Sequence, residues 1–464
     1  MRRALPERAR APRRTARPAT GSGRRAESYV VGEDVADWIN QPPVTLPAPE
    51  QAAPTAITAE QHVVGMASPA GERLLSLRQL RSTDWTLILA VTTLVAMGLL
   101  MVFSASQALN PTDPAYLLRR QALSAALGML ALIIAARIDY HRWWRLATPG
   151  LIIALALMSL TLVVGREANG AQRWLGGEYG FQPSELAKLA LSLFLAYWFA
   201  WVGPDIRSVR RGLLPFAGVT VLLTGLTLAQ RDMGTSIIIV SLAIAMYFSA
   251  GARTTHLLAL LALGALILGG LAISLSYRRA RLTGFLDPLP PGCDAANSYQ
   301  VCQGLLSLGS GGVAGAGLGA SVQKAGYLPF PQTDSIYAVL GGELGLLGCS
   351  LAIGLLIVVV WRGYRAGLRA PDAFGALLAC GITTWLAMQA VINIGGVVAA
   401  IPFTGVPLPF ISYGGAALFC EMAGVGVLLN IYSQGAPLRR ARLWRRTAPA
   451  RQHGVAQKPR LAGM

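Results

Sequence analysis

Residues 326–345 read GYLPFPQTDSIYAVLGGELG, and this stretch changes from loop to membrane segment near its centre. Asp334 stands where a loop containing Pro329 and Pro331 gives way to an apolar run at residues 335–360. That run is long enough to cross a hydrocarbon core of ~30 Å as a helix. A carboxylate at a membrane boundary is expensive to desolvate, so it marks a functional site by default. The stretch therefore predicts a membrane protein with Asp334 as a candidate functional residue.

The composition of the whole chain agrees with this prediction. Hydrophobic residues make up 53% of the 464 residues and charged residues only 13%, which is too apolar for a soluble protein. The pattern predicts an all-α, polytopic integral membrane protein with about ten transmembrane helices. The predicted spans are 84–105, 122–138, 147–165, 185–202, 212–230, 233–250, 256–276, 335–360, 373–398 and 415–432. A large extracytoplasmic loop is expected between the seventh and eighth helices.

Positive charge gathers at the two ends of the chain. Residues 1–25 contain nine Arg, and residues 437–464 contain eight Lys and Arg. Because Lys and Arg favour the cytoplasmic side of a membrane, we expect both termini in the cytoplasm. We expect a disordered basic extension at 1–82, a membrane domain at 83–436 and a basic tail at 437–464. The net charge of +18 is attributed to orientation and anionic lipids, and no nucleic-acid partner is expected.

The loops that this topology places outside are also basic, against the general rule. Two interpretations remain open. The basic residues either pair with acids such as Glu167 and Asp287, or hold an anionic ligand, since guanidinium groups suit phosphate oxygens. The residues concerned are Arg119, Arg120, Arg166, Arg173, Arg231, Arg278, Arg279, Arg281 and Lys324.

The cysteines and histidines limit the kinds of site. Cys293 and Cys302 lie nine positions apart in the large outer loop, where disulfides are permitted. They form either a structural disulfide or two free thiols. The four histidines are not grouped at ligand spacing, which argues against a His-based metal site.

Other segments have both structural and functional interpretations. The run GSGGVAGAGLG at 309–319 lacks the ending of a phosphate loop. Three of its glycines are spaced by four and would share one face of a helix, although close backbone packing or a re-entrant segment is favoured. Glu185 and Lys188 share a helix face and form either a local ion pair or part of a site. Asp232 opens the sixth span, where capping alone would explain it. Ser412 is either a turn residue or a site residue.

Several long motifs follow one another in a recognisable order. They include NGAQRWLGGEYGFQPSELAKLAL, QRDMGTSIIIV, SYQVCQGLLSLGSGG, the opening stretch, and INIGGVVAAIPFTGVPLPFISYGG. Together they resemble the SEDS family (shape, elongation, division and sporulation), which contains FtsW and RodA, from about Asp84 to Tyr432. The family usually has Glu and His where this chain has Phe330 and Gln332. The resemblance implies a ten-span peptidoglycan glycosyltransferase in the bacterial cytoplasmic (inner) membrane.

The resemblance also implies roles for individual residues. Asp334 matches the essential catalytic carboxylate of the family and would act as the base for an attacking sugar hydroxyl. The positions that match the outer cavity or its rim are Arg120, Arg173, Glu185, Lys188, Asp232, Lys324 and Ser412. The implied substrate is lipid II, whose sugars are carried on undecaprenyl pyrophosphate and joined with inversion. Because pyrophosphate is a good leaving group, positive charge or a divalent cation, Mg²⁺ or Mn²⁺, can replace the general acid.

Partners and alternatives follow from the same resemblance. A class B penicillin-binding protein is the expected partner, within either the divisome or the elongasome. Two other functions stay open: a lipid II flippase or transporter, and a non-catalytic scaffold of the cell-wall synthesis complex.

Overall fold

The computed structural model describes residues 83–109, 112–168, 171–176, 180–274, 284–289, 293 and 298–447. The predicted disordered extension at 1–82 lies outside these residues. The long helices are α3 (Trp85–Leu109), α4 (Tyr116–Arg137), α5 (Ala147–Val164), α6 (Pro183–Val202), α7 (Leu214–Ala229), α8 (Met233–Ser249), α9 (Thr254–Ser274), α11 (Tyr299–Gly311), α12 (Ile336–Arg369), α13 (Ala373–Val397) and α14 (Gly415–Thr447). The shorter elements are η1 (Tyr140–Leu146), η2 (Gly203–Arg207), η3 (Val209–Leu213), β1 (Arg166–Ala168) and β2 (Ala171–Trp174).

Each predicted span coincides with one of these helices, and α11 is an additional helix in the large loop before α12. Within the described residues, 8 helices are long and apolar enough to cross a membrane, which confirms a polytopic, helical membrane protein. Helix α8, with 17 residues, and the apolar segment Thr254–Gly264 of α9 are shorter. The count of ten crossings therefore stays a prediction. Helix α14 continues to Thr447, past the expected domain boundary at 436.

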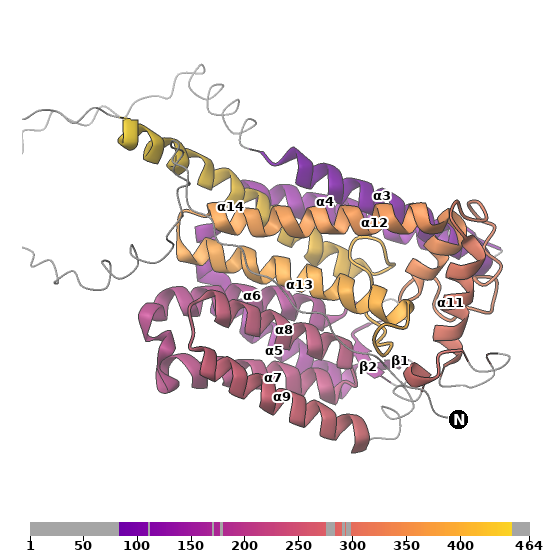
Figure 1. Cartoon of the computed structure of the whole chain (residues 1–464), viewed down its shortest axis with the longest axis horizontal. Coiled ribbons are helices and arrows are strands. Elements are labelled where there is room, and N and C mark those ends of the chain that lie inside the picture. The colour runs from indigo at the N-terminus through magenta and orange to yellow at the C-terminus, as the bar shows by residue number, and fades with distance from the viewer. Residues whose placement is uncertain are drawn as a thin grey trace, which may run out of the picture. The chain divides into compact units, whose positions relative to one another are not determined.

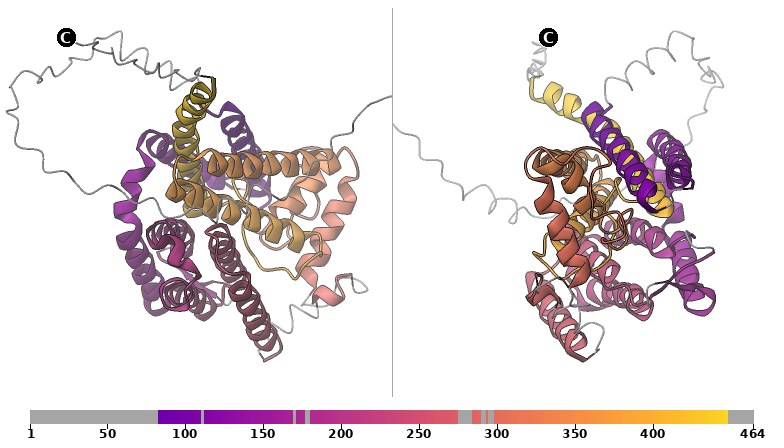
Figure 2. Two further views of the ribbon diagram at one scale, coloured as in Figure 1. Left: turned by 60° about the vertical axis from the view of Figure 1, so that its left-hand side comes forward. Right: turned by 90° about the vertical axis from the view of Figure 1, so that its right-hand side faces the viewer.

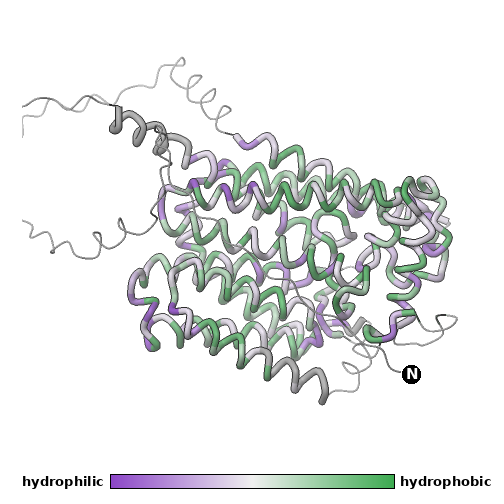
Figure 3. Tube along the Cα trace, viewed as in Figure 1, coloured by the Kyte–Doolittle hydropathy of each residue, from purple (hydrophilic) through white to green (hydrophobic). Residues whose placement is uncertain are grey.

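Helix α13 lies at the centre of the bundle. It packs against α6, α8, α12 and α14 (Figure 1). Of an apolar 18-residue stretch within α13, 72% is buried inside the protein. Helices α4 and α5 are more exposed at the surface of the bundle. Only 22% of the corresponding stretch of α4 is buried, and 28% of that in Tyr140–Val164, which contains α5. Helix α9 lies at the edge, next to α8 (Figure 2). The outward faces remain apolar because lipid tails, unlike water, favour hydrophobic side chains, and polar residues mostly gather at helix ends (Figure 3).

Helix α12 is interrupted at Gly345, whose φ of 64° and ψ of −161° are not helical. The glycine-rich segment that follows α11 lies against this break and supplies hydrogen-bond partners for the backbone groups there. Four bonds join the two: Ala316 N to Gly342 O (3.0 Å), Gly317 N to Glu343 O (3.1 Å), Leu346 N to Gly312 O (3.0 Å) and Leu347 N to Val313 O (3.2 Å). The backbone N–H and C=O groups at the break therefore form hydrogen bonds within the protein, as a non-aqueous environment requires.

The glycines of this segment do not share a helix face as the spacing suggested. Gly311 is the last residue of α11, whereas Gly315 and Gly319 lie in the loop with φ of 85° and 82°. The helical-face prediction is wrong because the helix ends before the second glycine. The favoured alternative, close backbone packing, is confirmed: a Cβ at Gly311 or Gly315 would collide with the α12 backbone.

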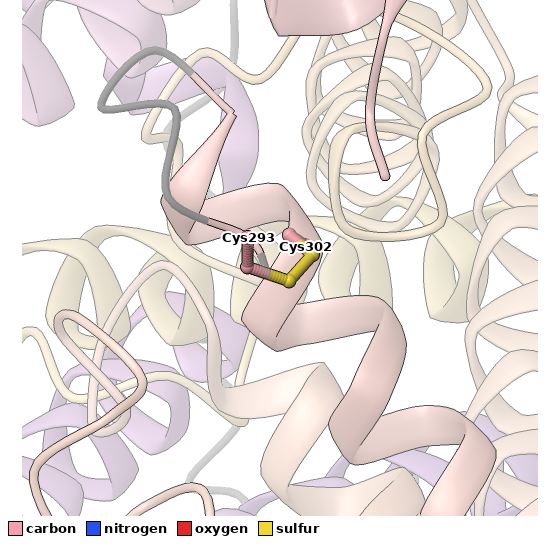
Figure 4. Close-up of a disulfide and its surroundings, with 2 residues drawn as sticks. All are labelled: Cys293 and Cys302. Atoms are coloured by element: carbon pink, nitrogen blue, oxygen red, sulfur yellow. A yellow bond between two sulfur atoms is a disulfide. The ribbon is translucent and has the colours of Figure 1, made fainter. Parts of the chain in front are cut away.

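Two further features organise the connecting loops. Strands β1 and β2 form an antiparallel hairpin, and an isolated bridge between Leu175 and Phe181 leads the chain into α6. Cys293 and Cys302 form a disulfide with a Cα–Cα distance of 5.9 Å (Figure 4). It ties the loop before α11 to the first turns of that helix.

Candidate active site

A cavity of about 440 Å³ opens near the N-terminal ends of α4, α8, α12 and α14. The hairpin, the loop before α12 and the loop between α13 and α14 complete its wall. Its volume is within the range of small-molecule sites. Four of the predicted site residues line it: Arg120, Arg173, Asp232 and Asp334.

Asp334 reaches the cavity from the loop before α12 and is partly buried. Its backbone carbonyl accepts a hydrogen bond from Asn393 Nδ2 (2.9 Å), which also donates to Val406 O (2.7 Å). Gly405 lies beside the carboxylate, since a Cβ there would be 3.0 Å from Asp334 Oδ2. Asn393 therefore fixes the Asp334 backbone, and the glycine leaves room for its side chain.

Ser412, another predicted site residue, lies just before α14 and is hydrogen-bonded to the loop that carries Asp334. Its hydroxyl donates to Thr333 O (2.7 Å) and accepts from Leu408 N (2.7 Å). The neighbouring Tyr413 N donates to Gln332 O (2.9 Å). Ser412 is buried and does not appear among the described residues that line the cavity. These contacts position the Asp334 loop.

Arg173 and Asp232 meet across the cavity wall. Arg173 Nη1 lies 3.5 Å from Asp232 Oδ2, and 16% and 1% of the two side chains are exposed. Asp232 also caps α8, because its Oδ1 accepts from Thr235 N (3.0 Å) and its Oδ2 from Thr235 Oγ1 (2.9 Å). Capping and cavity lining are thus combined in one carboxylate. Arg120 is exposed on α4, where its guanidinium donates to Tyr116 Oη (2.9 Å).

Glu185 and Lys188 are sealed inside the bundle. Their side chains are 1% and 0% exposed, and the Nζ–Oε1 distance is 2.7 Å. Lys188 Nζ also donates to Gln389 Oε1 (2.7 Å), and Gln389 Nε2 donates to Glu421 Oε1 (2.8 Å). We call these four residues the Lys188 network; it joins α6, α13 and α14.

The Lys188 network is hydrogen-bonded to the loop between α13 and α14, which forms part of the cavity wall. Gln389 Nε2 donates to Pro407 O (3.2 Å), and Glu421 Oε2 accepts from Phe410 N (2.9 Å). Both backbone groups belong to the loop that carries Gly405. Sequence reasoning missed Gln389 and Glu421, and also Asn393, although a polar residue within an apolar span was the available signal.

Lys324 is likewise buried in an ion pair. Its Nζ lies 2.6 Å from Glu343 Oε1, with 5% and 0% of the side chains exposed. Ser104 of α3 donates to Glu343 Oε2 (2.8 Å) and accepts from Lys324 Nζ (2.5 Å). These three residues, the Lys324 cluster, tie the loop before α12 to α12 and α3. In the described part of the chain, Lys324, Glu185 and Lys188 contact protein partners and do not line the cavity.

Phe330 and Gln332, where the family usually has Glu and His, both line the cavity. Phe330 has a φ of 50° and is 38% exposed. Gln332 is 8% exposed, and its Oε1 accepts no hydrogen bond from the described residues. A buried amide oxygen at a cavity wall is suited to accept a hydrogen bond from a ligand.

The fold and this cavity define a polytopic membrane protein with a carboxylate held among basic and apolar groups at one end of its helical bundle. Residues 84–436 match the family of cell cycle proteins that comprises FtsW, RodA and SpoVE. The chain belongs to this family, as its motifs predicted.

Individual relatives and solved structures support this family assignment. The chain is 39% identical over 356 residues to stage V sporulation protein E of Bacillus subtilis, covering 75% of this chain and 97% of that protein. It is 37% identical over 364 residues to a probable peptidoglycan glycosyltransferase FtsW of Geobacter metallireducens, covering 77% and 96%.

Among solved structures, RodA of Thermus thermophilus superposes with a TM-score of 0.56 at 30% identity, covering 75% of this chain and 96% of that one. A second solved structure shows the structural coordination of polymerization and crosslinking by a peptidoglycan synthase complex. One of its chains superposes with a TM-score of 0.63 at 31% identity, covering 76% of this chain and 98% of that one.

Proposed function

We propose that this chain is a peptidoglycan glycosyltransferase that polymerises lipid II at the outer face of the cytoplasmic membrane. The activity named for its FtsW relatives supports the class of reaction. The observation that carries the proposal is the Asp334 carboxylate in a cavity that Arg120 and Arg173 also line. Guanidinium groups bind phosphate oxygens, and the proposed substrate carries a pyrophosphate.

Asp334 acts as general base in this reaction. A hydroxyl of the acceptor sugar attacks the anomeric carbon of the donor and passes its proton to the carboxylate. The bond to the pyrophosphate oxygen breaks, and the departing lipid pyrophosphate keeps the electron pair. Attack opposite the leaving group inverts the anomeric centre, as in inverting glycosidases. Arg120 and Arg173 stabilise the charge that develops on the pyrophosphate.

A divalent cation fits this arrangement as a companion of the substrate. Among the described residues, no group of three His, Cys, Asp or Glu would hold a metal alone. Mg²⁺ commonly binds through one or two carboxylates and substrate phosphates, and the cavity offers Asp334 and Asp232. When bound, such a cation neutralises charge on the leaving group. Loss of polymer on chelation, with recovery on adding Mg²⁺ or Mn²⁺, would support it; unchanged activity would exclude it.

The decisive experiment supplies lipid II to the purified protein together with its partner synthase and measures glycan strands. Asp334→Asn is expected to lower the rate by about 10²–10⁴-fold, the usual contribution of a general base. Asp113→Asn is the matched control, because Asp113 pairs with Arg119 outside the cavity and should leave the rate unchanged. Strands made at the normal rate by Asp334→Asn would remove the base assignment. Translocation of lipid II without polymer would favour a transporter.

The partner and the topology are further parts of the proposal. We propose a class B penicillin-binding protein as partner, and both termini in the cytoplasm. In intact cells, a cysteine introduced at Thr112 before α4 should react with a membrane-impermeant maleimide, whereas one at Arg253 after α8 should not. The reverse labelling pattern would overturn the orientation and place the cavity on the wrong side for this function.

A further inference from the structure

A second cavity, of about 600 Å³, lies at the opposite ends of α8 and α12, the two helices that it shares with the first. Its wall comes from the C-terminal ends of α6, α8 and α12 and from the start of α13. Helix α8 relates the two cavities: Asp232 caps its start beside the first, and Ser249 is its last residue and lines the second. Its 17 residues span roughly 25 Å, most of a hydrocarbon core. The second cavity therefore belongs to the other leaflet.

Small residues create this hollow. Its lining includes Ala200, Gly203, Ala250, Gly367, Ala373 and Ala376. Larger apolar groups border it, and Leu368 at its edge is 89% exposed, so the cavity is open to its surroundings. An apolar hollow offers water few hydrogen-bond partners, and an empty one forfeits dispersion contacts. Within a leaflet, the group that fills such a space is a hydrocarbon chain.

Two arginines lie close along the chain to residues that line this cavity. Arg207 follows the lining residue Gly203 by four positions, and its Nε donates to Gly251 O (3.1 Å), directly after the lining residue Ala250. Arg253 lies two residues further on. Both are exposed, and neither forms an ion pair with a described carboxylate, whereas nearby Asp205 is paired with Arg211 at 2.6 Å. Guanidinium groups at a membrane surface attract phosphate.

We propose that this cavity binds an anionic phospholipid, with one acyl chain in the apolar hollow and the phosphate on Arg207 and Arg253. The shape of the hollow selects a chain, and the arginines select the charge of the headgroup. The proposal is independent of the reaction proposed for Asp334.

The test is photo-crosslinking of the full-length protein in vesicles. Phosphatidylglycerol or phosphatidylcholine carries a diazirine on its acyl chain, and labelled peptides are mapped by mass spectrometry. We expect labelling at residues 373–380 to favour phosphatidylglycerol. Arg207→Gln and Arg253→Gln should each reduce that preference by about fivefold. Arg142→Gln with Arg145→Gln is the matched control, since these exposed arginines lie on η1, which contributes no residue to the described wall of the cavity.

A second pair of variants tests the hollow itself. Ala250→Leu and Ala376→Leu should fill the space and lower the labelling by both lipids, while α5 is labelled as before. Equal labelling of residues 373–380 by the two lipids in the unaltered protein would overturn the proposal, because it would indicate ordinary boundary lipid. Labelling that survives both filling variants in folded protein would overturn it as well. If the filling variants do not fold, the exposed arginine variants still decide the question.

Discussion

Asp334 and Lys188 are both charged residues at predicted membrane spans, and the structure treats them in opposite ways. Asp334 is held by its backbone, through Asn393, and lines an open cavity with its carboxylate. Lys188 is fully buried, with Glu185 and Gln389 around its ammonium group. The difference teaches that a charge in an apolar segment has two separable uses. One kind of charge meets a ligand, and the other holds helices at the distance that shapes the cavity.

The largest effect should come from breaking the Lys188 network. Lys188→Met leaves the buried Glu185 without its cation, and removal of one partner of a buried pair costs about 3–5 kcal/mol. We expect a matching loss in the free energy of unfolding, measured in detergent. The double variant Lys188→Met with Glu185→Gln should recover much of it. A Lys188→Met protein with unchanged stability and no polymerase activity would instead place Lys188 in contact with substrate.

The Lys324 cluster should behave in the same way, with a somewhat smaller effect. Lys324→Met leaves Glu343 buried, but Ser104 still donates to that carboxylate, so we expect a loss of about 3 kcal/mol. Stability and activity should fall together, because this cluster anchors the loop that carries Asp334. Adding Glu343→Gln should restore both. Loss of activity at full stability, with no recovery in the double variant, would contradict a structural role.

Arg173 should show the smallest effect on stability and a clear effect on substrate use. Its side chain is partly exposed, and Asp232 keeps its bonds to Thr235 when the guanidinium is removed. Arg173→Ala should lower kcat/KM for lipid II about tenfold, the value of one hydrogen bond to a charged group. Arg119→Ala is the control, since Arg119 pairs with Asp113 outside the cavity. An equal change in both variants would mean that the effect is general surface charge.

The sequence predicted the helices well and their side-chain partners poorly. Hydropathy locates spans because the lipid environment acts on each helix separately, and α13 begins at residue 373, as predicted. The position of Asp334 at the start of a span was equally readable. The burial of Lys324 was not, because its partners Glu343 and Ser104 lie 19 and 220 residues away along the chain. The helical face proposed for Gly315 failed because spacing alone does not reveal where a helix ends.

The break at Gly345 also has a consequence for the order in which the molecule is assembled. A continuous helix leaves the insertion machinery with all of its backbone bonds made, but α12 does not. The segment at 312–317 supplies the hydrogen-bond partners for the carbonyls of Gly342 and Glu343 and for the amides of Leu346 and Leu347. That segment precedes α12 in the chain and must fold back onto it. The part of the protein that carries Asp334 is therefore complete only once residues 312–317 have packed against α12.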